Sequence, residues 1–168
     1  NIMNILGSHI GQYFMRKHSE KQLELMATHD TLTGLFNRRR FHEELERCLI
    51  YSRRYGTCGA LLFIDLDKFK YVNDTFGHQV GDELLINISS ELKRRLRQSD
   101  VLARLGGDEF VALLSPIDEK QAIHIAKKMV ETVHQSGMFT HGHNTGVTAS
   151  IGIAFFPRHS DTADSLIS

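Results

Sequence analysis

Two short apolar runs separated by turn-forming residues constrain the fold more than any other part of this sequence. The runs are Val101–Leu105 and Phe110–Leu114, and the four residues between them read Gly-Gly-Asp-Glu. Glycine accepts the backbone angles of tight turns, and apolar runs bounded in this way are typical of paired strands. The segment therefore predicts an antiparallel hairpin that carries two carboxylates at its tip.

The rest of the chain alternates between helix-like and strand-like segments. The run GALLFIDLD, residues 59–67, predicts a strand covered on both faces, and residues 147–156 predict another. Apolar residues recur at helical spacing in three segments, residues 41–52, 80–96 and 122–133. Residues 68–83 predict a polar loop with two glycines. This alternation predicts an α/β domain with a central mixed, partly antiparallel sheet flanked by helices.

The N-terminal segment predicts a helix distinct from that domain. Its apolar residues lie mostly on one face up to Phe14 and resume at Leu23, without a clean long heptad. We expect a connecting, signalling helix from an upstream sensory domain over residues 1–27, and a second domain over residues 28–168. A further helix begins near the last residues.

Composition excludes several classes of function. The 168 residues favour one domain plus a short appendage, and 20 basic residues balance 20 acidic ones. A chain without net positive charge is a poor candidate for nucleic-acid binding. No signal peptide or bilayer-spanning run is present, so we expect a cytoplasmic fragment without direct membrane contact, from a parent that could be anchored. Cys48 and Cys58 form no metal-like pair.

Three acids mark the candidate chemistry. Asp65 ends an apolar strand, and Asp108 with Glu109 lies at the hairpin tip. Converging carboxylates repel one another unless a hard cation such as Mg²⁺, or Mn²⁺ in its place, neutralises them. Such ions also bind phosphate oxygens during displacement at phosphorus. The alternative is that these acids serve only as turn residues.

Four sequence blocks resemble the GGDEF family of bacterial diguanylate cyclases. They are DTLTGLFNRR (30–39), FIDLDKFKYVNDTFGHQVGDELL (63–85), GGDEF (106–110) and SIGIA (150–154), in family order. The resemblance implies a nucleotidyl-cyclase, palm-like fold. It also implies a homodimer in which two GTP molecules condense into cyclic di-GMP and pyrophosphate, each 3′-hydroxyl attacking the other's α-phosphorus.

The resemblance also implies roles for individual residues. Metal binding falls to Asp65, the main-chain carbonyl of Leu66, Asp108 and Glu109, and Asp108 matches the family's proposed base. Substrate contacts fall to six residues: Asn73 and Asp82 on the guanine, His78 on the substrate, Lys70 near the phosphates, and Gly106 and Gly107 beneath it. Arg97 and Asp100 match the R-x-x-D site at which cyclic di-GMP inhibits the enzyme. For each residue a purely structural role in a turn, loop or helix end is the alternative.

Departures from the family pattern leave other functions open. The family's later A-D-x-A-x-Y-x-A-K motif, whose Lys contacts the triphosphate, is absent, which implies weak or no activity for this fragment. Lys68 stands where the family often has His or an aromatic residue. One alternative is an inactive GGDEF domain that binds GTP or cyclic di-GMP and regulates a partner; another is a cyclase of different base choice. For His134, His141 and His143 we expect a solvated loop rather than a metal site.

Overall fold

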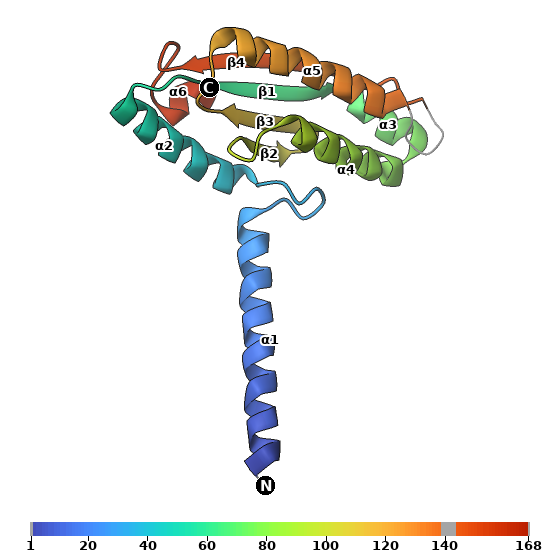
Figure 1. The fold of residues 1–168 in the computed structure, drawn as a ribbon. Helices are drawn as coiled ribbons and strands as arrows, with labels where there is room; N and C mark the ends of the chain where they lie inside the picture. The colour runs from blue at the N-terminus through green and yellow to red at the C-terminus, as the bar shows by residue number, and fades with distance from the viewer. Residues whose placement is uncertain (1, 139–143, 168) are drawn as a thin grey trace.

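The computed structural model describes residues 2–138 and 144–167, and it shows a long helix projecting from an α/β domain (Figure 1). The helix is α1 (Ile2–Thr28). The domain contains α2 (Arg38–Tyr55), β1 (Gly59–Asp67), α3 (Phe69–Phe76), α4 (His78–Arg95), β2 (Val101–Gly106), β3 (Glu109–Leu114), α5 (Glu119–Met138), β4 (Thr148–Phe156) and α6 (Ala163–Ile167). The expected α/β class, with helices flanking a central sheet behind an N-terminal helix, is confirmed.

The four strands form one sheet in the order β2-β3-β1-β4. Every neighbouring pair of these strands is antiparallel. Among the described residues, parallel pairing is limited to an isolated bridge between Phe36 and Ala103. The sheet is therefore more antiparallel than the expected mixed sheet, because the predicted hairpin and both long strands reverse direction at each step.

Strand β1 is covered on both faces, as its continuous apolar run predicts. Leu62, Ile64 and Leu66 point into a core shared with α3, α4 and α5. Leu61 points the other way, into a smaller core shared with α2 and α6. Side chains alternate along a strand, so Asp65 lies on the α2 side of the sheet, beyond the part that the smaller core covers.

The prediction of a polar loop over residues 68–83 is wrong. Helix α3 occupies Phe69–Phe76, and α4 begins at His78 after a single glycine, Gly77, with φ of +89°. Phe69 and Val72 are spaced three residues apart and are both buried in the main core. Tertiary burial of these two side chains thus stabilises a helix too short and polar to recognise from its pattern.

Helix termini follow the local sequence signals. Asn37 caps α2 by accepting a hydrogen bond of 3.0 Å from the Arg40 backbone N–H, and Gly56 ends that helix with φ of +66°. Asp118 accepts a hydrogen bond of 2.8 Å from the Gln121 N–H at the start of α5. These caps fix the directions in which the helices leave the sheet.

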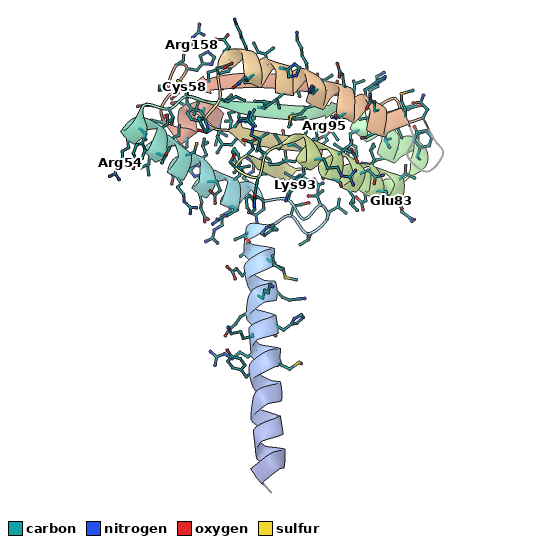
Figure 2. The ribbon with its side chains drawn as sticks, in the orientation of Figure 1. Arg54, Cys58, Glu83, Lys93, Arg95 and Arg158 are labelled. Atoms are coloured by element: carbon teal, nitrogen blue, oxygen red, sulfur yellow. The ribbon has the colours of Figure 1, made fainter. Side chains whose placement is uncertain are left out.

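Within the described residues no other element lies beside α1, and the side chains that Figure 2 draws on its C-terminal half project on more than one side of the helix. Met15, Leu23 and Met26 are 73%, 66% and 62% exposed. None of the helices within the described residues combines the length and apolar character needed to cross a membrane. The division into domains at residue 27 stays a prediction.

Candidate functional site

The predicted convergence of acids occurs at one edge of the sheet. Asp65 on β1 pairs directly with Glu109 on β3 in the antiparallel register. The Leu66 N–H donates a hydrogen bond of 3.3 Å to the Asp108 carbonyl, which joins the hairpin tip to the end of β1. Directly opposed residues place their side chains on the same face of a sheet. We call Asp65, Asp108 and Glu109 the acidic cluster.

The carboxylates of this cluster repel one another. The pKa of Asp65 is raised above its usual value, first by partial burial and then by the negative charges of Asp108, Glu109 and Asp67. The Arg38 guanidinium lies 3.7 Å from the Glu109 carboxylate, in an ion pair that is largely exposed. Like charges held together in this way favour binding of a cation.

The cluster is not a closed metal cage. Within the described residues, no group of three or more His, Cys, Asp or Glu side chains has an arrangement that could hold a metal ion by itself. This finding fits Mg²⁺, which usually takes one or two carboxylates and completes its shell with water and substrate phosphate oxygens. It does not fit a structural zinc site.

A groove of about 590 Å³ opens beside the cluster on the α2 side of the sheet. Asp65 and Glu109 line it together with Arg38, Ser150 and Gly152. Its volume lies within the range of small-molecule sites. Both carboxylates are therefore accessible to a ligand.

The hairpin tip is held from the side by Arg104. Gly106 and Gly107 have φ of +143° and +52°, and a Cβ at either position would meet nothing within 4 Å. The tip is thus open to an approaching ligand. Arg104 donates two hydrogen bonds to the Gly107 carbonyl, at 2.9 and 2.7 Å, and two more to Asp30. Neither Arg104 nor Asp30 was identified from the sequence, where no local pattern joins them.

Asp67 is a third residue that sequence reasoning missed. Its carboxylate accepts hydrogen bonds of 2.8 Å from the Thr148 and Ser150 hydroxyls on β4. The signal was available, because Asp65 and Asp67 share one face of β1 and Thr148 and Ser150 share one face of the neighbouring strand. Asp67 fastens the end of β1 to β4 directly beside the acidic cluster.

The predicted guanine-reading residues lie at the α3–α4 corner. Asn73 is in α3, and its side chain lies against Gly81 in α4, next to Asp82. Asp82, His78 and Lys70 are exposed. No hydrogen bond or ion pair between described residues connects this group to the acidic cluster.

The predicted inhibitory residues, Arg97 and Asp100, lie apart from both the acidic cluster and the α3–α4 corner. The Asp100 carboxylate accepts a hydrogen bond of 2.9 Å from the Arg97 backbone N–H, in the turn between α4 and β2. Burial raises the pKa of Asp100, against the opposing effects of this bond and of the Arg97 charge. A pocket of about 300 Å³ includes Arg97 and Asp100, and also His29, just after α1, and Lys93. Figure 2 shows Lys93 on α4 above the end of α1.

Three histidines, His134, His141 and His143, were expected in a solvated loop. The loop expected for His134 is wrong, because this residue lies on α5, although it is exposed to solvent as expected. His141 and His143 fall outside the described residues.

Comparisons with known proteins found a matching family model and similar curated proteins. Residues 27–168 match the family model "Diguanylate cyclase, GGDEF domain". The diguanylate cyclase TpbB of Pseudomonas aeruginosa is 40% identical over 142 residues, which cover 84% of this chain and 33% of TpbB. The probable diguanylate cyclase DgcE of Escherichia coli is 40% identical over 148 residues, covering 88% of this chain and 13% of DgcE. The chain thus spans a third or less of these relatives.

Solved structures show the same architecture. The GGDEF domain of TpbB has a TM-score of 0.72 and 38% identity, with 83% of this chain and 81% of that chain covered. The coiled coil and GGDEF domain of DgcB from Caulobacter crescentus, in complex with c-di-GMP, has a TM-score of 0.81 and 27% identity. That match covers 98% of this chain and 86% of the other, so it includes α1.

Proposed function

The chain belongs to the GGDEF-domain family of diguanylate cyclases, and we propose that it condenses two GTP molecules into cyclic di-GMP and pyrophosphate. The observation that carries this proposal is the acidic cluster, in which Asp65 and Glu109 are paired and Asp108 is hydrogen-bonded to β1. Three neighbouring carboxylates beside an open groove suit a divalent cation and a triphosphate.

Mg²⁺ fits the residues present, because the raised pKa of Asp65 reflects burial and three neighbouring negative charges. We assign its binding to the carboxylates of Asp65, Asp108 and Glu109 and to the main-chain carbonyl of Leu66. When bound, the ion supplies Lewis-acid stabilisation of charge on the phosphates. We assign Asp108 to metal binding rather than to proton transfer, because a metal-bound carboxylate is a poor base.

The hairpin tip and the α3–α4 corner bind and orient the substrate. Gly106 and Gly107 let the phosphates pass close to the hairpin backbone, where no Cβ intervenes. Lys70 and His78 are exposed near the start of α3 and α4 and are free to contact the nucleotide. Asn73 and Asp82 read the guanine edge, because a carboxylate accepts from the base N–H groups and an amide donates to ring acceptors.

The reaction requires two copies of the chain, because one acidic cluster serves one GTP and the two nucleotides must meet. Helix α1 is the candidate for bringing the copies together, since its described apolar side chains are exposed and no other element covers them. The similarity to a structure described as a coiled coil with a GGDEF domain supports this assignment. An upstream sensory domain would then act by changing how two α1 helices pair.

Product inhibition is proposed for the Arg97–Asp100 pocket. An arginine fork suits a phosphate or the Hoogsteen edge of guanine, and a carboxylate accepts from the guanine N–H groups. A relative was solved in complex with c-di-GMP, which supports this ligand class. The pocket also contains His29, so a bound product would contact the residue that follows α1.

The proposed activity is tested by incubating the domain, extended by the family's C-terminal A-D-x-A-x-Y-x-A-K motif, with GTP and Mg²⁺ and separating the products by chromatography. Cyclic di-GMP should form, and Asp108→Ala should abolish its formation. Glu131→Gln, an exposed change on α5, is the matched control and should remain active. If the unsubstituted, dimerised domain binds GTP but forms no cyclic di-GMP, the result would instead support a domain that only binds nucleotide and regulates a partner.

A further inference from the structure

Gly81 occupies a position in α4 where a neighbouring side chain, rather than backbone geometry, fills the space that a Cβ would take. It lies buried within the helix, and its φ is outside the left-handed region. A Cβ added there would overlap Asn73 Oδ1 and would lie 3.0 Å from Asn73 Cγ and 3.4 Å from Phe69 Cζ. Glycine is unfavourable in a helix interior, so a reason for it here is the close approach of Asn73.

The α3–α4 corner is built around this approach. The Gly77 N–H donates to the Asn73 carbonyl at 3.0 Å, and the Gly81 N–H donates to the Gly77 carbonyl at 3.3 Å. The corner therefore folds the side chain of Asn73 onto the first turn of α4, against Gly81, which precedes Asp82 in the chain. Within the described part of the chain, the Asn73 amide makes no side-chain hydrogen bond, so its donors and acceptor are available to a ligand.

We propose that Gly81 is a positioning residue for nucleobase recognition, because its missing Cβ lets the Asn73 amide rest beside the Asp82 carboxylate where both reach one base. The inference rests on the function proposed above, in which Asn73 and Asp82 read guanine. Gly81 does not touch the nucleotide; it acts through Asn73.

The expected effect of Gly81→Ala follows from the nature of the contact. The overlapping atoms belong to the end of a flexible side chain, and Asn73 relieves the overlap by rotating to another rotamer. Alanine also favours the helix over glycine. The variant should therefore stay folded, with a melting temperature equal to or above that of the parent, while the amide leaves its position.

The first experiment tests the geometry without nucleotide. The side-chain amide resonance of Asn73 is identified by its absence in Asn73→Ala, using ¹⁵N NMR of the full 168-residue chain. Gly81→Ala should shift this resonance, whereas Ser90→Ala, an exposed change in the same helix, should leave it in place. An unmoved Asn73 resonance in Gly81→Ala would overturn the inference and leave the proposed function standing.

The second experiment tests the consequence for binding with GTP and Mg²⁺ in a direct titration. Asn73→Ala and Gly81→Ala should each weaken GTP binding about tenfold, the value of one hydrogen bond, and narrow the preference for GTP over ATP. The double variant should bind no more weakly than either single variant, because both changes remove the same contact. Multiplied losses in the double variant would overturn the inference.

One outcome separates the two proposals. If Asn73→Ala binds GTP as tightly as the parent, Asn73 does not read the base. That result would overturn the role of Asn73 proposed above and, with it, the recognition role of Gly81, even if the resonance shift is observed.

Discussion

Arg104 and Asp30 lie 74 residues apart in the chain, and their side chains are joined by hydrogen bonds of 3.0 and 3.2 Å. The same guanidinium donates to the Gly107 carbonyl at the hairpin tip. Asp30 follows α1 by two residues, so one side chain links the base of the projecting helix to the edge of the acidic cluster. A change in the position of α1 can therefore reach the candidate site through the Arg104 side chain.

Removing this link should affect both stability and activity. Arg104→Ala leaves the partly buried Asp30 carboxylate without its charged partner, and we expect the free energy of unfolding to fall by about 2–4 kcal/mol in urea. Product formation should also fall, because the Gly107 carbonyl loses its two donors.

A surface ion pair provides the matched control for Arg104→Ala. Arg158 pairs with Glu119 at 2.8 Å, but these side chains are 69% and 54% exposed, against 11% and 21% for Arg104 and Asp30. Arg158→Ala should therefore lower the unfolding free energy by about 1 kcal/mol or less and keep activity. Equal losses in both variants would contradict the assigned role of Arg104.

Asp30 should make folding stability depend on pH in the acid range. Burial raises its pKa, but hydrogen bonds from the Thr33 side chain and backbone and the interaction with Arg104 outweigh burial and hold the pKa below 3.8. The unfolded chain then binds this proton more readily. The stabilisation is complete above pH 3.8 and is lost as the pH falls through the folded-state pKa.

Urea unfolding measured from pH 7 downward checks this expectation. Asp30→Asn should be less stable than the parent at neutral pH, and the difference between the two proteins should shrink below pH 3.8. A constant difference across the whole range would show that the carboxylate charge is not responsible.

Magnesium should stabilise the folded chain through the acidic cluster. At a Mg²⁺ concentration ten times the dissociation constant, we expect a gain of about 1.4 kcal/mol, observed as a higher melting temperature that EDTA reverses. Asp65→Asn should reduce this gain. Without metal, Asp65→Asn should be at least as stable as the parent, because it removes a carboxylate whose pKa is raised by burial and by three neighbouring charges.

A Mg²⁺ response that is the same in Asp65→Asn and in the parent would exclude the acidic cluster as the binding site. Glu131→Gln, exposed on α5, should respond as the parent does.

Product inhibition should depend on Arg97. Cyclic di-GMP added to the cyclase reaction should slow the parent, and Arg97→Ala should weaken that inhibition about tenfold or more, since a charged hydrogen-bonding partner is lost. Arg94→Ala is the control, because Arg94 lies three residues before Arg97, in the last turn of α4, and pairs at 2.8 Å with Glu91 on the surface. If the same concentration of cyclic di-GMP inhibits Arg97→Ala and the unsubstituted chain, the pocket is not the inhibitory site.

Local sequence patterns predicted much of the fold and the core of the site. The hairpin, both long strands and the stripes of α2, α4 and α5 were readable because period-two and helical repeats of apolar residues reflect burial directly. The convergence of Asp65 with Asp108 and Glu109 was expected because a strand end and a hairpin tip both carried acids. Helix α3 was missed, since its stability comes from Phe69 and Val72 packing into a core formed by distant segments.

The sequence by itself determined most of the elements, the helix caps and the family, because these depend on residue types at short and regular spacings. Only the tertiary structure decided that Arg104 joins Asp30 to Gly107, that Asp67 ties β1 to β4, and that Asn73 lies against Gly81. These contacts depend on how helices and strands pack in three dimensions, and packing brings together residues whose local patterns carry no information about one another.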